Sequence, residues 1–434
     1  MLFSSLFAKT AEYEKLAHAL SAPGACALFG LPGSGRAMVY AALAKETGRF
    51  LCIVTPGEAE ATRFAGDLNA LGIPTAVFPA RDYVLRPIEG TAREYEYRRL
   101  SVLGDIVGGR LQAVCVPDEG LTQYTTPRAE FCNNTRTLHP GDTVPRTELT
   151  ALLYNAGYAR RAQVDGPGQF SIRGDIVDLY APDMKLPVRM EFWGDEIDTM
   201  HTFDLATQRR EDPIEKIYVS PAREVLFGSP AEAAELLRAF IKKFRGKKRT
   251  ALEACLATEL AQLDGGALPV NMDKYLAVRY PQPATLLDYF DDPLLVLEEP
   301  ASLREAERAT TYRRGEEISA LLQDGVLAAG LDNLYAENGY LWAQAANHRT
   351  ICAENFARSM PDIPLKDIVN APAHTLPAWG GEVTSLLEDL QPLCNGGAAV
   401  TVLAGTQRAA AGLAADLRTK GLLVTTDPDA APGA

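Results

Sequence analysis

Hydrophobic residues in the first part of the chain follow two alternating patterns. Short apolar runs that end near glycine or proline are separated by longer segments in which apolar residues recur at helical spacing. Strands are predicted at 26–30, 50–56, 75–80 and 111–117, and helices at 36–46, 57–71 and 93–107. Continuous apolar runs predict strands that are buried on both faces, so the pattern indicates a parallel sheet covered by helices on both sides.

A different pattern extends from about residue 140 to about residue 221. Apolar and polar residues alternate in GQFSIRGDIVDLYAP (168–182) and in LPVRMEFWGDEIDTMHTFD (186–204), with tight turns between the runs. Strict alternation predicts strands with only one buried face. Helical segments follow, and the apolar run 293–300 predicts a strand that completes the interrupted sheet. The middle segment is therefore interpreted as a small domain inserted into the first.

From about residue 331 helical and apolar segments alternate again, which predicts a further small domain, and the final DPDAAPGA has the composition of a linker. We therefore predict an α/β fold with a RecA-like, P-loop-type parallel sheet, an inserted α+β domain, and a small separate α/β domain. The parallel-sheet domain is expected to consist of 1–135 and 223–325, the insertion of 136–222, and the last domain with its linker of 326–434.

Composition narrows the possible functions. The net charge of −13 repels nucleic-acid backbones, so nucleic-acid binding requires a local basic patch. The densest basic run is interpreted as a solvated helix end and comprises Lys242, Lys243, Arg245, Lys247, Lys248 and Arg249. Seven scattered cysteines without a CxxC pair disfavour disulfides and a zinc site, and no apolar run has the roughly 20 residues that cross a bilayer. A cytoplasmic protein without a membrane segment is expected.

A glycine-rich turn between the first strand and the first helix has the spacing of a phosphate-binding loop, G-x-x-x-x-G-K-[ST]. The turn contains Gly30, Gly33 and Gly35, but Arg36 and Ala37 stand where the motif has lysine and a hydroxyl residue. The lysine neutralises the β- and γ-phosphates and the hydroxyl binds Mg²⁺, so hydrolysis is expected to fail. Backbone amides at the helix start retain the means to hold an anion, and a purely structural remnant is the other interpretation.

A second nucleotide motif would be an acidic pair at the end of a buried strand. Glu298 and Glu299 have this position, but the first acid is glutamate rather than aspartate, and we interpret the pair as a relic. We expect no catalytic residues, no bound metal and no cofactor, because no other grouping of carboxylates, histidines or nucleophiles suggests a chemistry.

The inserted segment is the most specific part of the sequence. Residues 168–182 and 188–204 resemble the domain that UvrB and the transcription-repair coupling factor family share for binding UvrA. The segments 78–106 and 152–164 also resemble segments of these proteins and occur in the same order along the chain. UvrB has a working phosphate loop, a DNA-clamping aromatic hairpin and helicase motifs. Their absence here favours the coupling-factor family.

The resemblance implies which residues bind UvrA: Arg173, Arg189, Glu191 and Trp193. Alternation places the last three on one face of a strand, and an exposed aromatic residue beside arginine is typical of binding hot spots. The alternative is that Trp193 packs in the core and the arginines pair with Asp175, Asp178 or Asp195. RNA polymerase and double-stranded DNA are implied as partners of regions outside this chain.

We predict a non-catalytic docking module that recruits UvrA to stalled RNA polymerase. One alternative is an ATP-dependent, UvrB-like helicase subunit that tolerates Arg36 and Ala37. Another is a nucleic-acid-binding protein that uses the basic run at 242–249, in which case binding falls steeply with salt.

Overall fold

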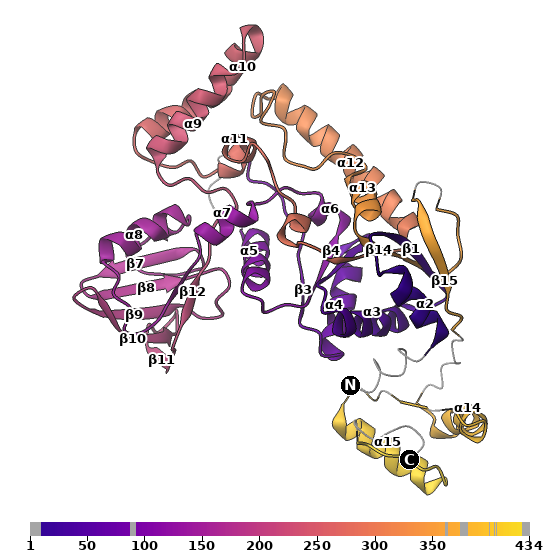
Figure 1. The fold of residues 1–434 in the computed structure, drawn as a ribbon. Coiled ribbons are helices and arrows are strands. Elements are labelled where there is room, and N and C mark those ends of the chain that lie inside the picture. The colour runs from indigo at the N-terminus through magenta and orange to yellow at the C-terminus, as the bar shows by residue number, and fades with distance from the viewer. Residues whose placement is uncertain are drawn as a thin grey trace.

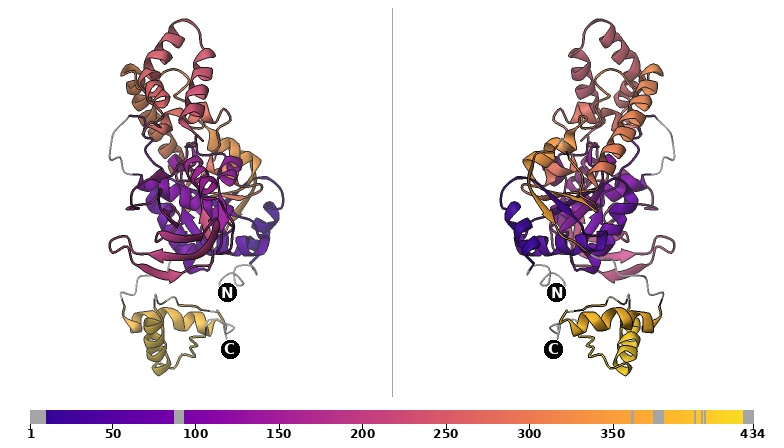
Figure 2. Two further views of the ribbon diagram at one scale, coloured as in Figure 1. Left: turned by 90° about the vertical axis from the view of Figure 1, so that its left-hand side faces the viewer. Right: turned by 90° about the vertical axis from the view of Figure 1, so that its right-hand side faces the viewer.

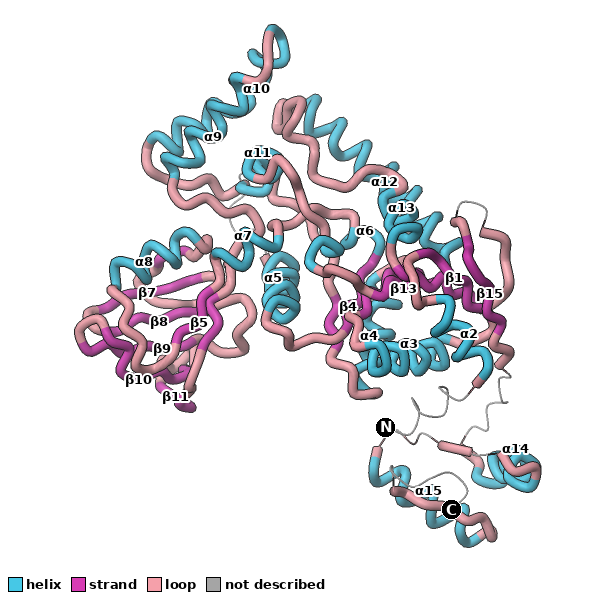
Figure 3. The backbone as a smooth tube through the Cα atoms, in the orientation of Figure 1, coloured by secondary structure: helices cyan, strands magenta, loops and turns pink. Residues whose placement is uncertain are grey.

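The computed structural model describes residues 10–86, 93–360, 363–373, 381–398, 400–402, 404 and 406–427. Its main body contains a parallel sheet and an inserted sheet, with a helical region beside them (Figure 1). The tube in Figure 3 shows the strands gathered in these two places, and a pair of helices that lies apart from the main body.

The central sheet has seven strands in the order β15-β1-β14-β13-β2-β4-β3, and every pairing between them is parallel. The strands are β1 (Gly24–Phe29), β2 (Leu51–Thr55), β3 (Thr75–Val77), β4 (Ala113–Pro117), β13 (Leu294–Glu298), β14 (Arg349–Glu354) and β15 (Leu365–Asn370). β1, β2, β4 and β13 are buried at every position, as expected for runs of apolar residues without alternation.

Helices cover both faces of this sheet. Cys26 and Leu28 of β1 pack toward α2 (Ala11–Ala19), α3 (Gly33–Thr47) and α4 (Glu58–Ala70). Ala27 and Phe29 point to the opposite face, toward α5 (Glu94–Val107), α12 (Pro300–Gln323) and α13 (Tyr340–Asn347). The predicted α/β class with a two-sided parallel sheet is confirmed.

The inserted sheet has the order β11-β10-β9-β8-β7-β6 and is antiparallel apart from the β6–β7 pair. Its strands are β6 (Ala159–Arg160), β7 (Gln169–Arg173), β8 (Ile176–Tyr180), β9 (Val188–Trp193), β10 (Glu196–Phe203) and β11 (Arg210–Pro213). One face packs against α8 (Arg146–Asn155), as the alternation predicts (Figure 1). The chain enters through β5 (Arg136–Leu138) and leaves through β12 (Ile217–Val219), which pair antiparallel.

A helical region follows the insertion. It contains α9 (Pro230–Lys242), α10 (Gly246–Asp264), η1 (Met272–Tyr275), α11 (Leu276–Arg279) and η2 (Leu286–Tyr289), and its core includes Leu321 near the end of α12. Short helices α6 (Asp118–Leu121) and α7 (Arg128–Asn133) connect β4 to the insertion. Buried ion pairs of Arg81 with Asp273 and of Arg99 with Glu224, both with N–O distances below 3 Å, tie this region to the central sheet.

The boundary expected at residue 326 is wrong for β14 and β15, because both strands belong to the central sheet, β14 between β1 and β13. The apolar run of β14 is buried on both faces, so it needs the large sheet rather than a small domain of its own. Among the described residues after β15, α14 (Val383–Asn395) and α15 (Gln407–Thr419) form a separate unit, which lies apart from the main body in both views of Figure 2. No strand is assigned within the described residues of 383–427.

Candidate protein-docking surface and the phosphate-type loop

The phosphate-type loop lies where the sequence predicts it, between β1 and the N-terminus of α3. Gly30 adopts a left-handed backbone conformation with φ of +90°, and the carbonyl oxygen of Ala371 would lie 2.7 Å from a Cβ at this position. Glycine is therefore required here, as in a functional loop. The guanidinium of Arg63 fills the space beside Gly33, so α4 closes over the loop.

Arg36 does not point outward to meet a phosphate. Its side chain is only 4% exposed, and its Nη1 lies 2.8 Å from Oε1 of Glu299 and 3.1 Å from Oε2 of Glu298. Tyr40, one turn further along α3, donates a 2.5 Å hydrogen bond to Oε1 of Glu298. The arginine of the degenerate phosphate loop thus pairs with both carboxylates of the degenerate acidic motif.

Burial raises the pKa of Glu298 to about 7, although Arg36 opposes this shift. Ala37 is fully buried in the core beside α4 and offers no oxygen to a metal. In the described part of the chain, no group of three or more His, Cys, Asp or Glu residues has the arrangement of a metal site. Arg36, Glu298 and Glu299, expected to be relics of a nucleotide site, are therefore brought together as an ion-pair cluster in which Arg36 and Glu298 are buried and Glu299 is 32% exposed.

The inserted sheet presents a polar outer face. In β9, Val188, Met190 and Phe192 point into the core, whereas Arg189 and Glu191 are half-buried on the other face and Trp193 is 83% exposed. The predicted sharing of one face is therefore observed, and Trp193 does not pack in the core.

Asp178 of β8 organises this face. Its carboxylate is fully buried and accepts hydrogen bonds from Nε and Nη2 of Arg189 at 2.7 and 2.9 Å, and from Nη2 of Arg173 at 2.6 Å. Asp178 lies directly opposite Arg189 in the antiparallel register, and the Arg189 guanidinium stacks 4.6 Å from the centre of the Phe203 ring. The hydrogen bonds to Asp178 raise the pKa of Arg189. The two arginines are thus held in fixed orientations, and the alternative pairing with Asp178 is observed for both.

Glu191 also has partners on this face. It forms an ion pair with Arg210 of β11 and accepts a 3.3 Å hydrogen bond from Thr199 of β10. Arg210 was not predicted from the sequence, because nothing in the neighbouring residues shows that its strand adds to the edge of this sheet. Trp193, at the end of β9, stands exposed beside this network of paired charges.

The basic run lies at the turn between α9 and α10, at the opposite end of the molecule from α14 and α15 (Figure 1). Arg249 pairs with Glu253 at 2.8 Å on the surface of α10. The run is thus a helix–helix turn, as its interpretation as a solvated helix end predicts, and it does not join the outer face of the inserted sheet. None of the helices in the described ranges is long and apolar enough to cross a membrane.

Fold and surface together define a class of protein. Its parallel sheet is of the nucleotide-binding type, but the arginine of its phosphate-type loop is paired with acidic residues of the same domain. A second, inserted sheet presents an ordered polar face. Comparison with known proteins agrees, because residues 137–225 match the family described as the UvrB interaction domain. The predicted resemblance to a UvrB-homology region of the transcription-repair coupling factor family is confirmed by this match and by similar proteins along most of the chain.

Two of these relatives illustrate the similarity. The transcription-repair-coupling factor of Bacillus subtilis (strain 168) is 26% identical over 375 residues, which cover 84% of this chain and 32% of the relative. That of Staphylococcus haemolyticus (strain JCSC1435) is 26% identical over 309 residues, covering 68% of this chain and 26% of the relative. The chain spans about a third or less of the length of these relatives.

Proposed function

We propose that this chain is a non-catalytic docking module that binds UvrA through the outer face of its inserted sheet. As part of a longer coupling factor, it recruits UvrA to a stalled RNA polymerase. Contacts with RNA polymerase and with double-stranded DNA are assigned to regions outside this chain. The match of residues 137–225 to the UvrB interaction domain supports the choice of partner.

The observation that carries the proposal is an exposed tryptophan on the same face of the inserted sheet as two arginines that a buried carboxylate orients. Trp193 is 83% exposed, and a large apolar side chain in water is stabilised when a partner covers it. Arg173, whose side chain is 47% exposed, keeps unused N–H donors while Asp178 fixes its position, whereas Arg189 is held mainly by Asp178 and Gln208. Tryptophan and arginine dominate binding hot spots, and fixed side chains lose little entropy on binding.

The phosphate-type loop supports the non-catalytic part of the proposal. For Mg-ATP to bind as in a functional loop, Arg36 would have to leave Glu298 and Glu299 and expose two carboxylates to the incoming phosphates. Like charges would then meet in a buried place, which is costly. Ala37 would still provide no ligand for magnesium.

The test is the affinity of immobilised UvrA for the full chain and for single variants. Trp193→Ala and Arg173→Ala are the informative changes, because both side chains are substantially exposed and their removal leaves the core intact. Arg238→Ala is a matched control, since it removes a half-exposed arginine that pairs with Asp264 on distant α10. We expect about tenfold or greater loss for the first two variants and no change for the control.

Two results would contradict the proposal. Unchanged UvrA affinity in both Trp193→Ala and Arg173→Ala would remove the outer face from the interface. ATP turnover by the purified chain, stimulated by DNA and lost in Arg36→Ala, would replace the docking module with the helicase alternative.

A further inference from the structure

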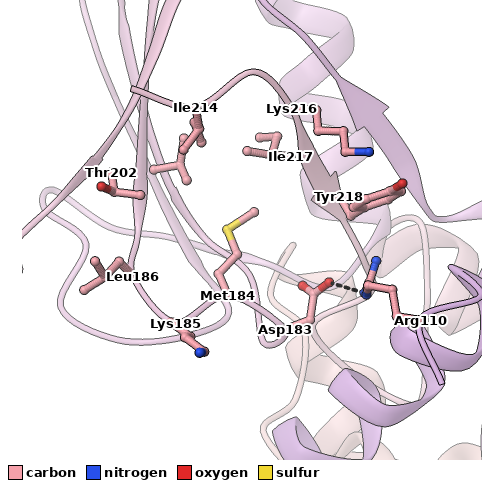
Figure 4. A pocket seen from close by; sticks show the side chains of 11 residues that line it. Arg110, Asp183, Met184, Lys185, Leu186, Thr202, Ile214, Lys216, Ile217 and Tyr218 are labelled. Atoms are coloured by element: carbon pink, nitrogen blue, oxygen red, sulfur yellow. Dashed lines mark hydrogen bonds and ion pairs between the residues drawn. The ribbon is translucent and has the colours of Figure 1, made fainter. Parts of the chain in front are cut away.

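A groove opens where the inserted sheet meets the segment that follows α5 (Figure 4). Its volume is about 410 Å³, within the range of about 300–1,000 Å³ that is typical of ligand sites. The groove is lined by residues 183–186 with Val188 at the start of β9, by Arg110 and Thr202, and by Ile214 and residues 216–218 around the start of β12. It therefore uses the connections of the inserted sheet rather than its outer face.

The floor of the groove is apolar. Met184 points into the middle of the groove in Figure 4, with Leu186 and Ile214 around it. Leu186 is 39% exposed, whereas Val188 and Ile217 are buried and close the floor from below. The groove thus offers apolar surface that is in contact with water in the free chain.

The charged side chains that line the groove are mostly cationic. Lys185 and Lys216 are exposed, and neither ammonium group has an ion-pair partner within the described residues. Arg110 differs, because its guanidinium lies 2.6 Å from Asp105 and 3.4 Å from Asp183.

The single acid of the groove is therefore occupied. Asp183 pairs with Arg110 and also accepts a 3.0 Å hydrogen bond from Ser220. The ammonium of Lys216 lies 5.6 Å from the centre of the Tyr218 ring, which holds it at the groove. Lys185 and Lys216 thus place two cations without ion-pair partners among the described residues at the edge of the groove, in a chain with a net charge of −13.

We propose that this groove binds a short acidic segment of a partner protein. An apolar side chain of the segment covers Met184 and Leu186, and flanking carboxylates reach Lys185 and Lys216. A small molecule fits less well, because such ligands are usually enclosed over most of their surface, whereas this groove is open to solvent. The site differs from the proposed UvrA surface, since Val188 lines the groove from the core face of β9, whereas Arg189 and Trp193 point to the opposite face.

The experiment uses the full chain with ¹³C-labelled methionine methyl groups and a synthetic peptide of alternating leucine and glutamate. We expect the peptide to shift the signal of Met184 and to leave those of Met190 and Met200, in the core of the same sheet, unchanged. Lys185→Glu with Lys216→Glu should weaken binding about tenfold or more. The same variant should gain affinity for a leucine–lysine peptide.

A matched control has the same change of charge elsewhere. Lys247→Glu with Lys248→Glu alters two exposed lysines of α10 and should bind the acidic peptide as the unaltered chain does. Undisturbed signals of Met190 and Met200 show that each variant remains folded.

Three results would overturn the proposal. The first is an absence of any Met184 shift with the acidic peptide. The second is equal affinity for the acidic and basic peptides, or binding that survives the double charge reversal at the groove. The third is a Met184 shift with dodecanoate but not with the peptide, which would identify a small-molecule site. None of these outcomes bears on UvrA binding, which is measured at Trp193 and Arg173.

Discussion

Replacing Arg36 by methionine tests whether the phosphate-type loop is a buried ion-pair cluster. The variant keeps an unbranched side chain of similar reach and removes the cation next to Glu298 and Glu299. Glu298, whose side chain is 2% exposed, then retains Tyr40 as its close hydrogen-bond donor. Removing one partner of a buried ion pair usually costs about 3–5 kcal/mol.

The pKa of Glu298 determines how this cost depends on pH. Its pKa rises from an ordinary 4.5 to about 7 on folding, so this carboxyl stabilises the folded chain when protonated. As pH rises from about 4.5 through 7, the unfolded state loses this proton first, and about 3 kcal/mol of folding stability is lost. Arg36 limits the loss because it lowers this pKa.

In Arg36→Met the pKa of Glu298 rises further, so the additional penalty appears mainly at higher pH. We expect the variant to be only modestly less stable than the original chain at about pH 5 and several kcal/mol less stable at about pH 8.5. Glu298→Gln in the same chain removes the buried charge and should restore much of this loss and abolish its pH dependence.

The measurement is hydrogen exchange of β1 and β13 peptides in increasing urea, because a chain with several modules need not unfold in one step. Peptides from β8 and β9 in the inserted sheet are an internal control. An Arg36→Met penalty that is equal at both pH values, or a double variant no more stable than Arg36→Met at high pH, would refute the reasoning.

Three further predictions concern the outer face and the loop. Asp178→Asn leaves Arg189 without its counter-ion. We therefore expect weaker UvrA binding and a loss of about 2–4 kcal/mol in the stability of β8 and β9 measured by hydrogen exchange. Unchanged stability would show that Asp178 does not organise the face. Trp193→Ala should change the same exchange stability by less than about 0.5 kcal/mol while lowering UvrA affinity roughly 30-fold, and a large stability loss would mean that Trp193 is structural. Millimolar Mg-ATP should leave the thermal unfolding midpoint of the chain unchanged, whereas a clear rise would reveal a nucleotide site.

Most of the central sheet was predictable, because strands that are buried on both faces have continuous apolar sequences. β13 was also predictable as the strand that resumes the sheet after the insertion. β14 was assigned to the wrong domain, because an apolar run carries no information on which sheet it joins, and its neighbour β1 is more than three hundred positions earlier in the chain.

The candidate docking surface was predictable only in part. The period of two in β9 correctly places Arg189, Glu191 and Trp193 on one face. The choice of Asp178 over Asp175 or Asp195 depends on strand register, which sequence spacing alone does not determine. The pairing of Arg36 with the Glu298–Glu299 motif likewise requires that the ends of β1 and β13 meet at one edge of the sheet.

The pairing of β5 with β12 has a consequence for how this architecture arises and changes. The two ends of the inserted domain run side by side, with Leu138 opposite Ile217, so the host needs only a gap of about 5 Å between its own chain ends. A whole recognition domain can therefore be gained, lost or exchanged at this junction without a change in the path of the host chain.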